Sequence, residues 1–113
     1  MKVEQLLDAV VQAWRSGDAH RASAFFASDG VYHEAFGTPI AGREAIFQHF
    51  SRFFRDGPLW TFEIDDLLVE ANRAAVRYRF ALKDADGSWK ERAGCALVDL
   101  ENGLIKIWRE YQG

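Results

Sequence analysis

From Leu59 onward the chain contains four strand-like segments in succession, and this run constrains the fold more than any other feature. Residues 73–83 alternate apolar and charged side chains, and similar segments follow at 88–100 and 104–111. Turn signals separate the segments, the strongest being Asn102-Gly103, which is typical of a two-residue hairpin. We therefore expect an antiparallel meander of four strands.

The first of these strands, over residues 59–70, changes phase along its length. Trp60, Phe62 and Ile64 share one face, whereas Leu67 lies one position out of step with them. One extra residue in a strand has this effect, and such a β-bulge also bends the strand. The sequence thus predicts a bulge near Asp65-Asp66 and a curved sheet.

Helical periodicity dominates the first half of the chain. Apolar residues within 3–14 recur at the i, i+3, i+4, i+7 spacing, Gly17 ends that helix, and Asp18 is a suitable N-cap for a short second one. A third helix is expected over 43–55. A turn at Ser28-Asp29-Gly30 and a strand over 31–36 are expected between the second and third helices, with a short extended piece through Ala41. Helices followed by a run of strands favour an α+β fold, with the helices on one face of the sheet.

Composition narrows the classes of function. The 113 residues suit a single domain over 1–113, and a net charge of −3 without a run of Lys or Arg argues against nucleic-acid partners. No signal peptide and no apolar run of membrane-spanning length is present, and the single cysteine, Cys95, suits a reducing compartment. We therefore expect a cytoplasmic protein with no membrane partner. No cofactor or metal is expected, since no phosphate loop or metal-ligand spacing occurs.

Three local patterns, in this order, resemble those of a known superfamily. They are Trp14-Arg15-Ser16-Gly17-Asp18, the stretch from Val31 to Ile46 with its Gly42-Arg43-Glu44 helix start, and the ending from Asn102 to Tyr111. The chain resembles the nuclear-transport-factor-two-like superfamily, which includes SnoaL-like polyketide cyclases, ketosteroid isomerases and limonene epoxide hydrolase. The resemblance implies three N-terminal helices packed on a curved, mainly antiparallel sheet that encloses a conical pocket, the cystatin-like fold.

The resemblance also implies positions for a site. By spacing from Gly42, the general-base Asp of the isomerases falls on His33, with Val31, His33 and Ala35 facing inward. The isomerases' oxyanion-hole Tyr falls near Val10 and their second Asp near Cys95, and neither residue replaces that strong hydrogen-bond donor. The last strand ends in Tyr111-Gln112-Gly113, without the Tyr-x-Asp of many SnoaL-like members. Steroid isomerisation by the relatives' mechanism is therefore disfavoured.

Carboxylate partners for His33 would come from the sheet. Glu91 and Asp99 share the parity of Cys95, and both reach the cavity if that parity points inward. The alternative is a solvated strand face on which these acids pair with arginines. For Glu110 and Tyr111, of opposite parity, only one can face inward.

Aromatic residues are the expected ligand contacts. Six of them from helices and strands are predicted to line an apolar cavity: Trp14, Phe50, Phe54, Trp60, Phe62 and Trp108. The alternative is that the same rings simply fill the core.

Three functions remain open at this point. In the first, the protein binds a small apolar molecule and catalyses a cofactor-independent proton transfer of isomerase, cyclase or hydratase type, with His33 as the base. The second is a pocket that stores or senses a ligand, and the third is a dimerisation or interaction module with a filled core. A homodimer through the outer sheet face is expected in addition, because apolar residues occur on both parities of the strands.

Overall fold

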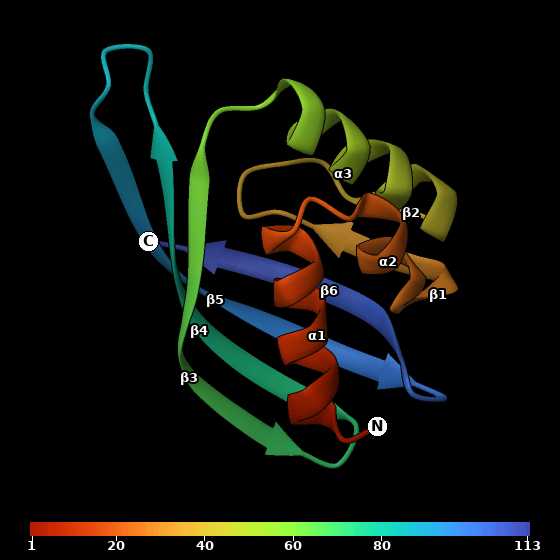
Figure 1. Ribbon diagram of the computed structural model, residues 1–113. Helices are drawn as coiled ribbons and strands as arrows, with labels where there is room; N and C mark the ends of the chain where they lie inside the picture. The colour runs from red at the N-terminus through yellow and green to blue at the C-terminus, as the bar shows by residue number, and fades with distance from the viewer.

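The computed structural model describes all 113 residues, as three helices and one six-stranded sheet (Figure 1). In chain order the elements are α1 (Val3–Arg15), α2 (Ala19–Ala24), β1 (Phe26–His33), β2 (Ile40–Ala41), α3 (Arg43–Asp56), β3 (Trp60–Glu70), β4 (Arg73–Lys83), β5 (Trp89–Glu101) and β6 (Leu104–Gln112). The α+β architecture expected from the sequence is confirmed.

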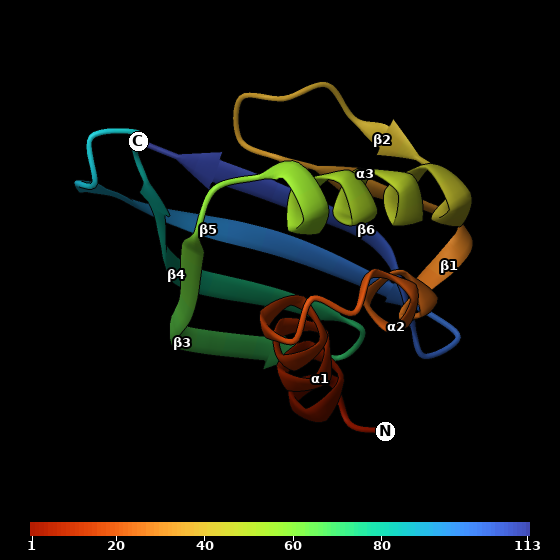
Figure 2. The ribbon, with the colours of Figure 1, turned by 45° about the horizontal axis from the view of Figure 1, so that its top comes forward.

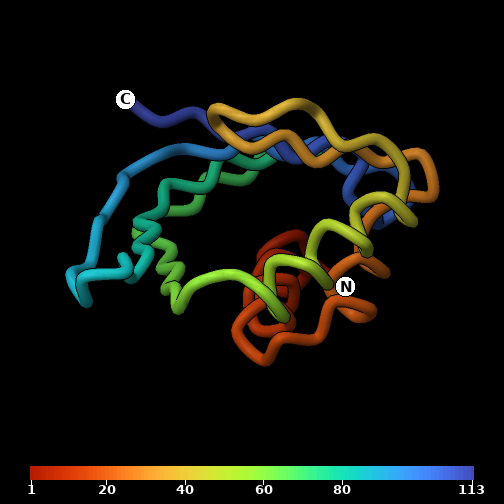
Figure 3. Tube along the Cα trace, turned by 90° about the horizontal axis from the view of Figure 1, so that it is seen from above, coloured from red at the N-terminus to blue at the C-terminus, as the bar shows by residue number.

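The sheet has the strand order β2-β1-β6-β5-β4-β3. Strands β3 to β6 form the expected antiparallel meander, while β1 pairs with β6 in parallel and with β2 antiparallel. All three helices lie on the same side of the sheet (Figure 2). Seen from above, the strands curve around them (Figure 3). One face of the sheet is thus covered and the other is left open.

Helix α1 packs through the apolar stripe predicted for it. Leu6, Leu7, Val10 and Val11 are all at most 3% exposed. Residues Ser16 to Asp18 then reverse the chain, with Gly17 in the left-handed region at φ +70°, where glycine is favoured. Asp18 caps α2 as expected, since its side chain accepts a hydrogen bond of 2.9 Å from the backbone N–H of Arg21.

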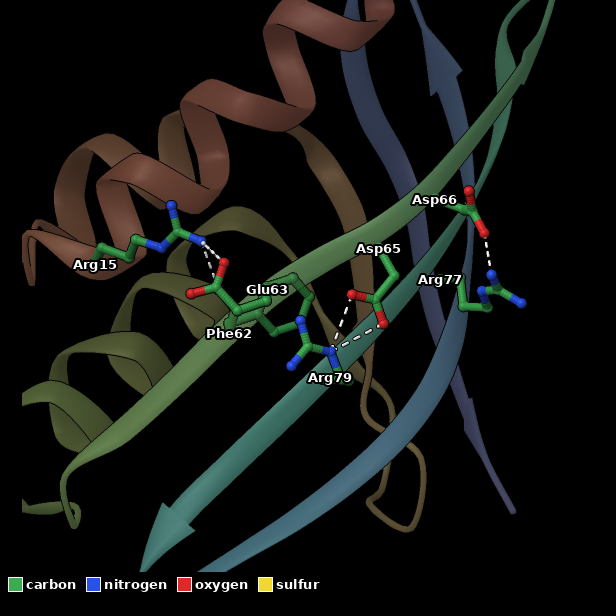
Figure 4. Close-up of polar contacts among 7 residues, drawn as sticks. All are labelled: Arg15, Phe62, Glu63, Asp65, Asp66, Arg77 and Arg79. Carbon is green, nitrogen blue, oxygen red and sulfur yellow. Dashed lines mark hydrogen bonds and ion pairs between the residues drawn. The ribbon is translucent and has the colours of Figure 1, made fainter.

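The predicted bulge lies in β3 at Asp65. Ile64 pairs with Tyr78 and Asp66 pairs with Arg77, so Asp65 is the extra residue. It accepts a hydrogen bond of 3.0 Å from Arg79 on the outer side, next to an ion pair between Asp66 and Arg77 (Figure 4). The bulge lets Ile64 before it and Leu67 after it both face the helices.

The expected turn at Ser28-Asp29-Gly30 is wrong. Strand β1 begins at Phe26 and runs through these residues, which form an irregularity in its pairing with β6. Gly30 lies against the opposing backbone, because a Cβ there would be 2.9 Å from the carbonyl oxygen of Ile105. Turn-forming residues here mark a break in register instead of the end of a strand.

The core lies between the helices and the inner face of the sheet. Phe26, Ile46, Val76, Ile105 and Trp108 have no measurable exposure. None of the helices is both long and apolar enough to span a membrane.

The β3 bulge provides a test of the sheet's register. Inserting one alanine directly after Asp65 forces one half of β3 to turn its inward side chains outward, so we expect a loss of several kcal/mol in the free energy of unfolding. Asp65→Ala, the matched control, removes only an exposed ion pair and should cost less than about 1 kcal/mol. Urea unfolding measures both, and equal stability of the two variants would contradict this account of the bulge.

Candidate functional site

A cavity of about 560 Å³ lies between α3, the end of α1 and the inner face of the sheet. Half of its 20 lining residues are Phe, Tyr or Trp: Trp14, Tyr32, Phe36, Phe50, Phe53, Phe54, Trp60, Phe62, Tyr78 and Phe80. We call this space the aromatic cavity. Its volume is in the range of pockets that bind small organic molecules.

Glu110 is a carboxyl group in the wall of the aromatic cavity, surrounded by aromatic side chains. The indole N–H of Trp108 donates a hydrogen bond of 2.9 Å to its Oε2 atom. The hydroxyls of Tyr32 and Tyr78 lie 3.4 Å from Oε2 and Oε1 respectively, and the amide of Gln112 donates a 2.9 Å bond to the Tyr78 hydroxyl. A carboxyl group is thus held by aromatic donors in an apolar wall.

The register of β6 places Glu110 there. Lys106 is an extra residue between Ile105, which pairs with Leu100, and Ile107, which pairs with Asp99. This shift turns Trp108 inward after the buried Ile105, and the period of two then turns Glu110 inward as well.

Burial raises the pKa of Glu110 to about 7, because the charged form loses its hydration in this wall. The hydrogen bond from Trp108 opposes the rise, and the nearby carboxylate of Glu34 adds to it. The pKa of each phenol, Tyr32 and Tyr78, is raised in turn, first by burial and then by the charge of Glu110. Both tyrosines therefore stay protonated at neutral pH and act as donors.

A second polar pair lies in the same wall. Glu34 follows β1, and its Oε1 atom is 3.1 Å from Nε2 of His49 on α3. The centroid of the His49 ring lies 5.8 Å from the centroid of the Tyr32 ring. The aromatic cavity is thus lined by a carboxyl group with a raised pKa and by a carboxylate–imidazole pair.

Tyr78 depends on a glycine across the strand. Gly94 on β5 pairs directly with Tyr78, and a Cβ there would be 2.6 Å from its ring. The tyrosine therefore lies flat over Gly94 and stacks on Phe62, with ring centroids 4.9 Å apart. Any larger residue at position 94 would displace the hydroxyl that faces Glu110.

The expectation that His33 projects into the cavity is wrong. Its Nε2 atom lies 3.1 Å from the carbonyl oxygen of Gly37 in the following loop, and Tyr32 and Glu34 take the inward positions instead. Tyr32 buries its ring against Phe50, with ring centroids 5.1 Å apart. An inward His33 would bury less apolar area than this tyrosine does, so the register that buries Tyr32 is favoured. The inferred register of β1 was off by one residue.

The expected inward parity of Glu91 and Asp99 is also wrong. Ala96, Val98 and Leu100 face the core, so the other parity of β5 is on the outer face. Asp99 accepts a 2.8 Å hydrogen bond from Arg73 there, as the alternative interpretation held. Apolar side chains took the buried positions because they gain most from leaving water.

Five of the six predicted aromatic residues line the cavity: Trp14, Phe50, Phe54, Trp60 and Phe62. The sixth, Trp108, lies behind the wall with no exposure and supports Glu110. Trp14 contacts it edge to face at 5.2 Å between centroids, and the buried indole N–H of Trp14 has no hydrogen-bond partner in the protein.

Sequence reasoning left Glu110 undecided against Tyr111, and it missed Glu34 and His49 as site residues. A signal for Glu110 was present, since it shares the parity of Trp108, a residue expected to face inward. Glu34 shares the parity of Tyr32 in the same way. The position of His49 beside Glu34 has no signal in the sequence, because it depends on how α3 lies over β1.

Replacing Glu110 tests its environment. An unfolded glutamate loses its proton near pH 4.5, whereas the native one keeps it up to about pH 7. Between these two pH values, unfolding therefore releases the proton of Glu110. The contribution of Glu110 to the free energy of unfolding falls as the pH rises through this range. Glu110→Gln lacks this effect, so its stability relative to wild type should increase by up to about 3 kcal/mol across that window.

Urea unfolding at a series of pH values measures this difference. Glu91→Gln on the outer face is the control and should follow the wild-type pH dependence. A constant difference between Glu110→Gln and wild type from pH 4 to 8 would show that Glu110 is not buried as described.

Comparison with solved structures gives the same fold. A hypothetical protein with a ketosteroid isomerase-like fold from Catenulispora acidiphila, in complex with trimethylamine, aligns with a TM-score of 0.84 at 18% identity, over 97% of this chain and 86% of the other. An LEH-like epoxide hydrolase from M. tuberculosis aligns with a TM-score of 0.84 at 17% identity, over 96% and 80%. A putative polyketide cyclase from Xanthomonas campestris aligns with a TM-score of 0.76 at 24% identity, over 97% and 89%.

At these identities the alignments establish the fold alone. No curated protein sequence matches the chain. The model of the SnoaL-like domain, however, matches residues 7–108, which is most of the chain. Together with the curved sheet and its three covering helices, this match shows that the chain belongs to the SnoaL-like domain family, on a nuclear-transport-factor-two-like fold.

Proposed function

We propose that the protein binds a small, largely apolar molecule in the aromatic cavity and transfers a proton to or from it through Glu110. The observation that carries the proposal is the carboxyl group of Glu110, with a pKa of about 7, in the wall of a 560 Å³ aromatic cavity. A general acid or base is most effective when its pKa lies near the working pH. Substantial fractions of both forms of Glu110 are then present at neutrality.

The surrounding donors suit a reaction at a carbon next to a carbonyl group. As a carboxylate, Glu110 removes a proton from that carbon, and the electron pair of the broken C–H bond moves onto the carbonyl oxygen. Tyr32 and Tyr78 remain protonated and supply hydroxyl donors in the same wall. Returning the proton to another carbon gives an isomerase, and attack of the enolate on a second carbonyl gives a cyclase.

The Glu34–His49 pair is the second acid–base group of the proposal. It lies in the same wall, and its carboxylate contributes to the raised pKa of Glu110. The pair places a second group that can exchange protons beside Glu110, and acid–base catalysis often uses two such groups in one site. In this assignment Glu110 replaces His33 as the base, with Trp14, Phe50, Phe54, Trp60 and Phe62 as ligand contacts.

We also propose a homodimer through the outer face of the sheet. Leu68, Leu97, Ile107 and Tyr111 are 36–73% exposed on β3, β5 and β6, although large apolar residues on a strand normally face a core. Charges of both signs surround them, among them the Arg73–Asp99 pair at 2.8 Å. An apolar patch with both signs at its edge suits a second copy related by two-fold symmetry.

Proton transfer is testable without knowing the natural substrate. In D2O, the wild-type protein should accelerate deuterium incorporation at the α-carbon of an apolar ketone such as 2-tetralone, followed by NMR. Glu110→Gln should lose at least about 100-fold of that acceleration, the lower end of what general acid–base groups contribute. Glu91→Gln is the control on the outer face. Binding of the ketone with no acceleration would support the alternative function, a pocket that binds its ligand without chemistry.

The dimer is tested by a charge at the centre of the patch. Leu97→Glu should convert a dimer at tens of micromolar, on the order of concentrations usual for such measurements, into a monomer, because two buried carboxylates would oppose each other across the two-fold axis. Leu59→Glu, at a residue 64% exposed just before β3, should remain dimeric. A wild-type monomer in analytical ultracentrifugation would refute the proposal.

A further inference from the structure

Among the cationic side chains that line the aromatic cavity, all but one are paired with a carboxylate. Glu34 pairs with His49 at 3.1 Å, and Asp84 pairs with Lys90 at 3.2 Å between the two charged groups. Arg92 also lines the cavity, but its guanidinium contacts only the backbone carbonyl of Glu91, at 3.3 Å. Its charge has no carboxylate partner within the protein.

Strand register places Arg92 at the opposite end of the cavity from Glu110. Glu110 pairs with Ala96, and Gln112 pairs with Gly94, so Arg92 is one step further along the same inward row of β5. Arg92 is four positions from Ala96, which corresponds to on the order of 13 Å along an extended strand. Arg92 comes shortly after the β4–β5 hairpin in the sequence. In Figure 1 this hairpin extends beyond α1, at the end of the molecule where the chain passes from α3 to β3.

The wall between these two ends is aromatic. Phe80 pairs with Arg92 across β4 and β5, and Tyr78 pairs with Gly94 in the next inward row. Trp60 lies beside Phe80, with ring centroids 6.3 Å apart, and all three rings line the cavity. A molecule that spans the cavity meets a cation at one end, rings along its length and Glu110 at the other end.

We propose that the ligand is an amphipathic organic anion, whose carboxylate or similar group binds Arg92 while its apolar body extends toward Glu110. The inference rests on the proposed binding function and adds the class of ligand. The guanidinium fork matches a carboxylate with two hydrogen bonds, and Arg92 has no competing acid. Arg92 is therefore a specificity-determining residue, which holds the ligand so that its uncharged end lies near Glu110.

A pair of probes of equal shape and unequal charge tests the inference. Binding of 6-phenylhexanoic acid and of its primary amide, 6-phenylhexanamide, is measured by isothermal titration calorimetry at pH 8, where the acid is ionised. The wild-type protein should bind the acid about tenfold more tightly than the amide, as expected for one charge-assisted contact with an exposed arginine at the edge of the cavity.

The variants separate the charge from the pocket. Arg92→Gln should weaken the acid about tenfold and leave the amide unchanged, and Arg92→Lys should restore part of the loss. Arg52→Gln is the matched control, because Arg52 is exposed on α3 and does not line the cavity. Circular dichroism melting checks that each variant is folded.

Equal affinity of the wild-type protein for the acid and the amide would overturn the role of Arg92 and leave the binding function standing. Loss of the acid and the amide together in Arg92→Gln would also overturn it, since the residue would then shape the pocket instead of recognising charge. Failure of both probes to bind the wild-type protein at millimolar concentration, a lower limit for specific affinity, would contradict the binding function itself.

Discussion

Register shifts in the sheet decide which side chains face the helices, and the rest of the structure depends on them. One lies in β1 between Phe26 and Val31, one in β3 at Asp65, and one in β6 at Lys106. Because side chains alternate with a period of two, the single extra residue in β3 and the one in β6 each reverse the faces of everything that follows in the strand. The shifts also curve the sheet, so the helices leave a cavity over part of it.

The shifts in β1 and β6 lie against each other. The ion pair between Asp29 and Lys106 joins the two irregular segments on the exposed side, and it lowers the pKa of Asp29. Beyond this point β1 presents Tyr32 and then Glu34 to the cavity, while β6 presents Trp108 and Glu110. Two parallel strands with matched irregularities thus bring two carboxyl groups to one wall.

Burial of Glu110 lowers the stability of the folded protein, because the charged carboxylate loses hydration. A carboxyl group in an aromatic wall loses hydration, and the donors Trp108, Tyr32 and Tyr78 offset only part of the loss, so the pKa remains near 7. A core built for stability alone would place an apolar residue there. An acid at this position, beside tyrosines whose own ionisation is suppressed, is consistent with the acid–base role proposed for Glu110.

Local sequence patterns determined the elements of this protein, and tertiary contacts determined its site. Helix periodicity, the Asp18 cap, the hairpin at Asn102-Gly103 and even the β3 bulge were predictable, because each depends on neighbours within a few residues. The faces of β1 and β5 were not, and His33, Glu91 and Asp99 were assigned to the wrong side. Which of the two faces of a strand turns inward depends on which one buries more apolar area against α1 and α3. These helices are far from the strands in sequence, so local patterns do not decide it. The pairing of Glu34 with His49 and the burial of Glu110 exist only once those helices have packed, since a pKa is set by the surroundings of the folded group.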